Sequence, residues 1–323
     1  MKTASILILI TAFMLCLFTG SVEIPPHDVV AALTGGEMSN EAWRYIITQM
    51  RLPAALTAML TGAALGTAGL LLQGYFRNPL AGPSILGITS GANLAVGVMM
   101  LAVGSSIGGM AMIGAAMTGA LGVMAVLMLL ATKVRQNITL LIVGILTSYL
   151  TSAVLTLLQY EASAEGVQML MVWGLGTFAQ VGMHHMALFA GTITLALWGS
   201  LWLIKPMNGW MLGELYAQNL GIRPHTVRWG VLAVTGVLCA VTTAWCGPIA
   251  FVGLSVPHIA RMMCKTDNHR QLLPMSMLLG ATCTTLCLWI STLPEGGRTL
   301  PINALTPLFG VPVIMWVIMR RKG

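Results

Sequence analysis

The chain has 323 residues, of which 57% are hydrophobic and 8% are charged, and its mean hydropathy is +0.86. Soluble domains have about 25% charged residues, so this composition excludes an ordinary soluble protein and indicates a polytopic membrane protein. The basic residues behind the net charge of +7 form no stripe and have no accompanying aromatic platform. They therefore predict orientation in membrane lipid and no nucleic-acid partner.

Apolar runs of about 20 residues, long enough to cross a bilayer, recur along the chain. A shorter run at 166–178 is expected to be re-entrant or interfacial. The sequence therefore predicts an all-α polytopic membrane protein with about ten transmembrane helices in one domain, residues 1–323. The predicted spans are 3–20, 52–75, 84–103, 107–132, 138–159, 183–204, 227–246, 249–263, 271–293 and 302–320.

The placement of the basic residues supports this even number of spans. With the N-terminus in the cytoplasm, 13 of the 16 Lys and Arg residues fall on the cytoplasmic side. The other three, Arg44, Arg51 and Arg298, fall outside. Because cytoplasmic loops carry an excess of Lys and Arg, the asymmetry predicts a multi-pass protein with both termini in the cytoplasm.

The acidic residues limit the mechanism. All nine Asp and Glu residues fall between the predicted spans, whereas ion-coupled carriers commonly place ionisable groups inside the membrane. The chain also has no GxxxxGK[ST] loop for nucleotide phosphates. We infer that any uphill transport is powered by a partner subunit.

Metal-ligating residues are present, but their spacing does not predict a metal site or a resident cofactor. The six cysteines lie in or beside apolar runs without CxxC spacing and are expected to be small packing residues. His184 and His185 are adjacent, so on a helix their side chains point about 100° apart and are expected to lie at the outer membrane interface.

Two segments interrupt the apolar pattern with Gly and Pro. They are LLQGYFRNPLAGPSILGI at 71–88 and TTAWCGPIAFVGLSVPHI at 242–259. Five spans separate them, so the two halves have opposite orientation, and they predict an inverted internal repeat of the kind common in transporters. His258, near the cytoplasmic end of the second segment, is expected to cap or snorkel, with a functional role left open.

Four stretches of the chain carry a family resemblance and keep their order. They are 51–93 (RLPAALTAML…ITSGAN), 220–232, 247–263 (GPIAFVGLSVPHIARMM) and 300–321. The chain resembles the permease subunits of vitamin B12 and iron-chelate ABC importers, which transport cobalamin, ferric siderophores or haem. The resemblance implies a cobalamin-permease-like fold in a cell inner membrane and a homodimer with the translocation path on its axis. It also implies two cytoplasmic ATP-binding subunits and a periplasmic or lipid-anchored substrate-binding protein.

The longest predicted cytoplasmic loop, 205–229, corresponds to the family's coupling element, which docks on the ATPase. Its middle reads as two short helices separated by Gly221 and Pro224, and Gly221 is expected to take a positive φ. Apolar side chains in it are costly to leave in water without a partner; these are Trp210, Leu212, Leu215, Tyr216 and Leu220. The resemblance places the ATPase contact at or near Glu214, Leu215, Gln218, Gly221 and Arg223.

Two further sites are expected, a gate that the resemblance implies and a docking site inferred from two of the three external basic residues. The cytoplasmic gate falls on Gln136, Asn137 and Thr139, which are polar but uncharged. Docking of the binding protein is expected at Arg51 and Arg298. Four positions depart from the family's pattern, in which they are usually charged, and leave the cargo and the docking details open; they are Ala54, Leu288, Thr292 and Thr299.

Two other functional classes are weighed against the importer subunit. A stand-alone secondary carrier would transport cargo without an ATPase, and its uptake would collapse with the proton gradient. An integral membrane enzyme would need a catalytic constellation. The chain has no HExxH motif and no pair of carboxylates within a predicted span, so nothing in it favours an enzyme.

Overall fold

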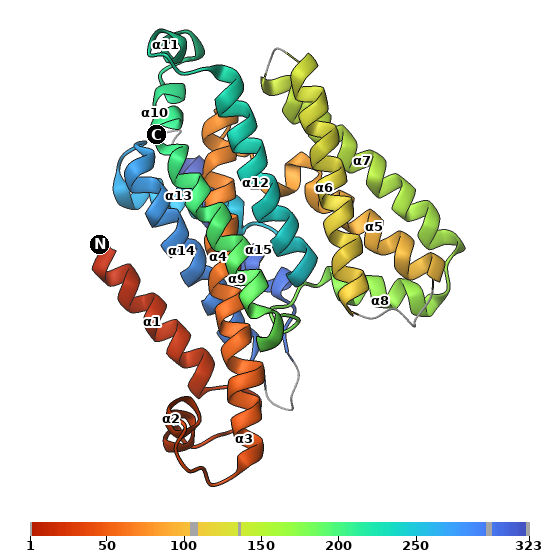
Figure 1. The fold of residues 1–323 in the computed structure, drawn as a ribbon, viewed down its shortest axis with the longest axis vertical. Coiled ribbons are helices and arrows are strands. Elements are labelled where there is room, and N and C mark those ends of the chain that lie inside the picture. Colours follow the sequence, from red (N-terminus) through yellow and green to blue (C-terminus); the bar gives the residue numbers. More distant parts are fainter. Residues whose placement is uncertain (1, 104–108, 135–136, 295–298, 321–323) are drawn as a thin grey trace.

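The computed structural model describes residues 2–103, 109–134, 137–294 and 299–320, and these residues form helices and loops without a strand (Figure 1). The elements, in chain order, are α1 Lys2–Phe18, α2 Pro26–Thr34, α3 Glu41–Tyr45, η1 Ile46–Arg51, α4 Leu52–Phe76, η2 Pro83–Leu86, α5 Ile88–Val103, α6 Gly109–Lys133, α7 Asn137–Glu161, α8 Ala164–Gly174, α9 Met183–Trp202, α10 Ile204–Met211, α11 Glu214–Asn219, α12 Pro224–Cys246, α13 Val252–Cys264, α14 His269–Ser291 and α15 Ile302–Arg320.

Each of the ten predicted spans coincides with a helix, namely α1, α4, α5, α6, α7, α9, α12, α13, α14 and α15. Within the described residues, six helices are long and apolar enough to cross a bilayer, and α1, α5 and α15 are shorter apolar helices. With 13 residues, α13 rises only about 20 Å, so the extended segment before it must cover the rest of the bilayer. The predicted interfacial run forms the short helix α8.

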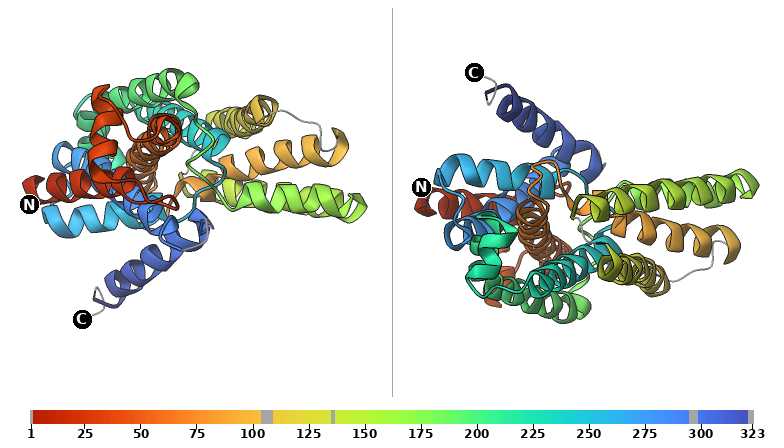
Figure 2. Two further views of the ribbon diagram at one scale, coloured as in Figure 1. Left: turned by 90° about the horizontal axis from the view of Figure 1, so that it is seen from below. Right: turned by 90° about the horizontal axis from the view of Figure 1, so that it is seen from above.

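Helix α4 is the centre of the bundle and is buried along most of its length. It packs against α14, α12, α13 and α9. Small residues allow this, since a Cβ on Gly66 would lie 2.6 Å from the Ser276 carbonyl oxygen of α14. Figure 2 shows that α5, α6 and α7 form an arm on one side of this core, and that α15 leaves the core in another direction.

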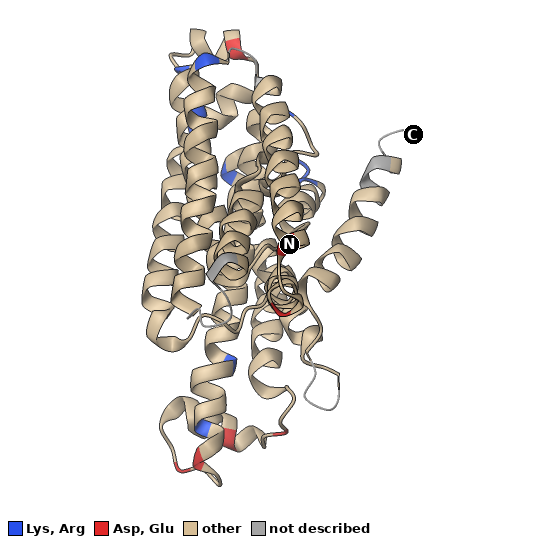
Figure 3. Cartoon of the chain, turned by 90° about the vertical axis from the view of Figure 1, so that its right-hand side faces the viewer, with Lys and Arg blue, Asp and Glu red and all other residues tan. Residues whose placement is uncertain are grey.

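The two ends of the bundle differ in charge and shape. Basic residues gather at the end that carries α11, while α2 and α3 form an outer lobe with acidic side chains at the opposite end (Figure 3). The N-terminal end of α1 and the C-terminal end of α15 both point toward the α11 end (Figure 1). This arrangement fits the orientation inferred from the basic residues.

The two Gly/Pro-rich segments meet inside the bundle, as an inverted repeat would place them. Gly82 to Ile85 of the first segment and Ile249 to Leu254 of the second line a small common cavity of about 100 Å³. A hydrogen bond joins the same two segments, since the Gln73 amide near the end of α4 donates to the Leu254 carbonyl at 3.0 Å. Helix α13 therefore begins beside the first segment and continues to the α11 end.

Candidate functional site

Helix α11 is a short, well-defined projection at the inner end of the bundle (Figure 1). The predicted pair of short helices is present as α10 and α11, but the break between them falls at Gly213; Gly221 and Pro224 instead separate α11 from α12. Gly221 has φ +79°, as predicted. Its N–H donates to the Gln218 carbonyl, and the next N–H, of Ile222, donates to the Ala217 carbonyl, both at 2.9 Å. This pair of bonds is a Schellman motif, which satisfies the last carbonyls of α11.

The residues predicted for ATPase contact are all exposed; they are Glu214, Leu215, Gln218, Gly221 and Arg223. Apolar residues accompany them on this projection; Leu212, Leu215, Tyr216 and Leu220 are 65%, 76%, 68% and 63% exposed. Ala217, fully buried, faces the bundle instead. Exposed apolar patches outside the spans are typical of contacts with protein or membrane, so this patch is a candidate interaction site.

Trp210 does not belong to this patch, contrary to the sequence-based expectation. Its side chain is 2% exposed, and its ring stacks on Tyr75 with a centroid distance of 5.6 Å. The sequence signal was correct that the indole needs a partner, but this partner lies within the chain. Trp210 therefore anchors α10 to the C-terminal end of α4.

His258 and Arg261 also have internal partners. His258 is buried, and its Nε2 lies 2.9 Å from the Pro79 carbonyl oxygen, so it neither snorkels nor caps its own helix. Arg261 donates to the Gln73 side-chain oxygen at 2.6 Å, and its Nε lies 3.7 Å from Asp267. These two residues join α13 to α4 and to the segment that follows it.

The predicted gate lies where α7 begins. Gln136 lies outside the described residues, Asn137 is the first residue of α7, and Thr139 is half-buried in its first turn. Farther along α7, exposed hydroxyl groups follow one face at helical spacing; they belong to Tyr149, Ser152, Thr156 and Tyr160. Because polar side chains in a span face protein or water in preference to lipid, this face of α7 is a candidate wall of a polar path.

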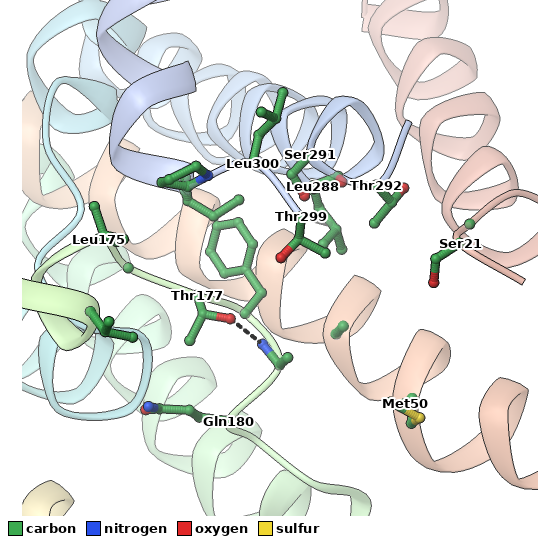
Figure 4. Close-up of a pocket in the computed structure, with 18 of the residues that line it drawn as sticks. Ser21, Met50, Leu175, Thr177, Gln180, Leu288, Ser291, Thr292, Thr299 and Leu300 are labelled. Atoms are coloured by element: carbon green, nitrogen blue, oxygen red, sulfur yellow. Dashed lines mark hydrogen bonds between the residues drawn. The ribbon is translucent and has the colours of Figure 1, made fainter. Parts of the chain in front are cut away.

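A cavity of about 740 Å³ opens at the outer end of the bundle (Figure 4). The loop after α1, the segment from η1 to the start of α4, helix α8 with the segment that follows it, the end of α14 and the start of α15 surround it. Hydroxyl and amide groups line part of the wall, among them Thr177, Gln180 and Ser291 (Figure 4). Methionines from distant parts of the chain supply flexible apolar surface; these are Met50, Met100, Met112 and Met169.

All four positions that depart from the family's charged pattern line this one cavity. Ala54 comes from α4, Leu288 from α14, and Thr292 and Thr299 from the two sides of the loop between α14 and α15. At these four positions the cavity wall has hydroxyls and apolar groups where the resemblance predicts charges. Among the described lining residues, Arg51 carries the one formal charge.

The Arg51 guanidinium hydrogen-bonds to backbone carbonyls of its own chain. Its Nη1 donates to the Leu17 carbonyl at 2.8 Å, and its Nη2 donates to the Val22 carbonyl. The guanidinium therefore fastens the loop after α1, which borders the cavity, to the start of α4. Arg298, the other predicted docking residue, lies outside the described residues.

The His and Cys residues considered as metal ligands do not come together in the part of the chain that the structure describes. Within the described residues, no group of three or more His, Cys, Asp and Glu side chains has the geometry to hold a metal ion. His185 packs beside Trp245 with a ring-centroid distance of 5.4 Å, and His184 is exposed. Cys283 and Cys287 lie on one face of α14, where Cys287 is buried.

Sequence analysis missed Asn303, which joins three segments at the outer end. Its Nδ2 donates to the carbonyls of Gly174 at 2.8 Å and Pro248 at 2.5 Å, while its side-chain oxygen accepts from the Ala250 N–H at 3.0 Å. A lone Asn in an apolar span was the available clue, because buried amides need several partners. Asn303 holds α8 and α15 against the segment that precedes α13.

Comparisons with known proteins agree with this geometry. The vitamin B12 import system permease protein BtuC of Klebsiella pneumoniae is 32% identical over 317 residues, covering 98% of this chain and 92% of that protein. The BtuC of Citrobacter koseri is 32% identical over 322 residues, covering 100% of this chain and 94% of that protein.

Solved structures give the same fold. One described as an inward-facing conformation of a putative metal-chelate type ABC transporter has a TM-score of 0.86 and 30% identity, with 98% of each chain covered. PsaBC from Streptococcus pneumoniae, at 17% identity and a TM-score of 0.57, shares the fold alone. The FecCD transport family profile matches residues 8–320, almost the entire chain. The chain therefore belongs to the FecCD transport family, whose members are the membrane permease subunits of ABC importers and leave ATP hydrolysis to a separate subunit.

Proposed function

We propose that this importer permease carries a metal-bearing organic chelate without net charge, and that cobalamin is its cargo. The observation that carries this proposal is the wall of the outer cavity, where Ala54, Leu288, Thr292 and Thr299 offer no charge. The names of the curated relatives, vitamin B12 permeases, support the same cargo.

The physical reason is desolvation. A charged group moved from water into a poorly polar wall loses hydration, and only a matched counter-charge restores the lost free energy. The described lining offers one cation, Arg51, whose guanidinium nitrogens donate to the Leu17 and Val22 carbonyls. Hydroxyls and methionines suit a neutral cargo with amide and apolar surface, whereas a polyanionic ferric tris-catecholate would find little compensation.

Competition for uptake tests the cargo. The permease is reconstituted in liposomes with its ATP-binding and substrate-binding subunits, and labelled cobalamin uptake is measured against haem, a neutral ferric hydroxamate and a ferric tris-catecholate. We expect ATP-dependent cobalamin uptake and no transport of the tris-catecholate. Preferred transport of the tris-catecholate or of haem, whose two propionates are anionic, would contradict the proposed charge class, and preferred transport of the neutral hydroxamate would assign an iron chelate in place of cobalamin.

A charge placed in the cavity gives a second, independent test. Thr292→Asp should slow cobalamin uptake because the new carboxylate must stay hydrated in the cavity wall. Thr292→Val, which has nearly the same shape and no charge, is the matched control and should transport nearly normally. Equal uptake by both variants would mean that the cargo does not pass this wall.

Helix α11 is the proposed contact with the ATP-binding subunit. The apolar patch around Leu215, 76% exposed, supports this, as does its place at the basic, inner end. Leu215→Asp should abolish co-purification of the ATP-binding subunit while membrane insertion stays intact. Asn219→Asp adds the same charge to α11 without removing an apolar side chain, so it should keep the complex. Normal assembly and uptake with Leu215→Asp would exclude α11 as the coupling element.

The stoichiometry remains a proposal drawn from the family: two copies of this chain, two ATP-binding subunits and one binding protein. The exposed hydroxyl-bearing face of α7 supports a homodimer, because a second copy could enclose it together with water on the axis. Thr139, with Gln136 and Asn137, would then form the cytoplasmic gate on the same helix. Cysteine cross-linking between copies at Ser152 would test this arrangement, and failure to cross-link in the assembled importer would contradict it.

The binding protein is proposed to dock at the outer end, in a cell inner membrane with both chain termini in the cytoplasm. Arg298 would meet it directly. Arg51 would act through the loop that it fastens to α4. Charge reversal at Arg298 should slow capture of the binding protein most strongly at low salt, since exposed charges act mainly on association rate. An unchanged association rate over a salt series would exclude Arg298 from docking.

Uptake that persists without the ATP-binding subunit and collapses with the proton gradient would instead identify a stand-alone secondary carrier.

A further inference from the structure

The inner end of the bundle contains a continuous line of buried and partly buried contacts that starts at Trp210, in the last turn of α10. Its ring is nearly parallel to that of Tyr75, at an interplanar angle of 16°, and its Nε1 donates to the Tyr75 carbonyl at 3.0 Å. Arg77, which follows α4 in a left-handed conformation, donates to the Trp210 carbonyl. Stacking and two hydrogen bonds therefore clamp α10, and with it the adjoining α11, to the end of α4.

Arg228, near the start of α12, continues this line. Its Nε donates to the Tyr75 hydroxyl at 3.0 Å. Its Nη1 donates to the Val134 carbonyl at 2.9 Å and to the Ala131 carbonyl. Those two carbonyls belong to the C-terminal end of α6, where backbone acceptors lack partners within the helix and the helix dipole favours a cation. One side chain thus holds the end of α4 and the end of α6 together.

The line leads from the proposed ATPase contact to the proposed gate. It runs from α11 through Trp210 to Tyr75, then through Arg228 to Val134, which directly precedes segment 135–139. Tyr75 is fully buried and its bond to Trp210 is buried, whereas the bonds of Arg228 are partly buried. A guanidinium is planar and rigid, and its fork fixes the positions of its acceptors relative to each other.

We propose that Arg228 and Tyr75 are positioning residues that transmit displacement of α10 and α11 to the end of α6, and so to the start of α7 at Asn137 and Thr139. This inference rests on the function proposed above for α11. A cap that only stabilised α6 would need the Ala131 and Val134 carbonyls alone. The additional bond from Arg228 to the Tyr75 hydroxyl gives the cap a second anchor, on the aromatic pair that holds α10.

Two conservative variants test the transmission. Tyr75→Phe removes the hydroxyl acceptor and keeps the ring that stacks on Trp210. Arg228→Lys keeps the positive charge but cannot donate to all three acceptors in the same fork geometry. The matched controls are Tyr45→Phe in the exposed outer lobe and Arg270→Lys at the exposed start of α14. All four chains are reconstituted with the ATP-binding and binding-protein subunits, and the readout is cobalamin taken up per ATP hydrolysed.

Loss of coupling has a distinct signature. We expect both test variants to assemble and to hydrolyse ATP within about twofold of the unaltered complex, while uptake per ATP falls about fivefold or more, as loss of a coupling free energy predicts. The controls should keep the normal ratio. If instead thermal stability and the amount of complex fall while uptake per ATP stays normal, Arg228 is only a helix cap and the proposal is wrong.

The unaltered complex separates this failure from failure of the proposed function. If the unaltered chain does not co-purify with an ATP-binding subunit or shows no ATP-dependent uptake, the importer function itself fails, and the transmission role fails with it. If the unaltered complex transports and the two variants keep its ratio, only the transmission role is excluded.

Discussion

Replacing Gly69 by Ala should force α4 and α13 apart. A Cβ on Gly69 would lie 2.5 Å from the Gly253 carbonyl carbon and 2.8 Å from its Cα, and closer still to its carbonyl oxygen. Ordinary contact begins at 3.4 Å, so the helices must separate by at least 0.9 Å (3.4 − 2.5). The obstacle is backbone and cannot rotate away. Overpacking of this kind costs about 1–3 kcal/mol.

The separation should also weaken the bond between the Gln73 amide and the Leu254 carbonyl, one turn farther along, for about 1 kcal/mol more. We therefore expect Gly69→Ala to lower the free energy of unfolding by about 2–4 kcal/mol. The measurement is intrinsic tryptophan fluorescence of the purified chain during thermal and sodium dodecyl sulfate titration in mild detergent.

Gly122→Ala is the matched control. Gly122 lies within α6, and an added Cβ there meets nothing within 4 Å. Helix propensity alone then favours Ala by about 0.5–1 kcal/mol, so this variant should be as stable as the unaltered chain or slightly more stable. If Gly69→Ala unfolds at the same midpoint as Gly122→Ala, the helices do not cross as closely as described, and the reasoning fails.

Three other outcomes are expected. Gly221→Val should lower the free energy of unfolding by about 1–2 kcal/mol, because Val is strained at this positive φ, and it should reduce affinity for the ATP-binding subunit, which pull-down titration measures. Unchanged affinity would show that the contact does not depend on the turn that ends α11. Asn303→Ala removes three hydrogen bonds to partly buried backbone groups, each worth about 0.5–1.5 kcal/mol, and should lower the detergent unfolding midpoint, whereas an unchanged midpoint would exclude its joining role. A reporter fused after Arg270 should read cytoplasmic and one after Gly296 external, and the opposite readings would invert the orientation.

Hydropathy predicted the helices well because lipid acts on each span separately. A run such as 138–159 must satisfy its backbone internally whatever surrounds it, so composition alone predicts the helix α7. Gly221 was predictable for a similar reason, since its positive φ is a local requirement. Composition is a weaker guide to α13, because its 13 residues are too few to cross a bilayer and the segment before it covers the rest.

Side-chain partners far apart in sequence could not be predicted in the same way. Trp210, His258 and Arg51 each carry a polar group that must be satisfied, which the sequence indicates, but their partners lie 135, 179 and 34 residues away. Hydropathy treats each as an interfacial residue, because it has no information about which helix ends meet. The cavity is a similar case, since its wall is assembled from segments between Cys16 and Ile302.

The geometry of α11 has a consequence for how the importer assembles. Its six residues are held between two positive-φ glycines, Gly213 and Gly221, and closed by the Schellman bonds before any partner arrives. Ordering six flexible residues on association would cost about 6–12 kcal/mol of backbone entropy. Since that ordering is complete beforehand, the proposed contact of α11 with the ATP-binding subunit would need only a modest area, and the two subunits would associate as rigid bodies.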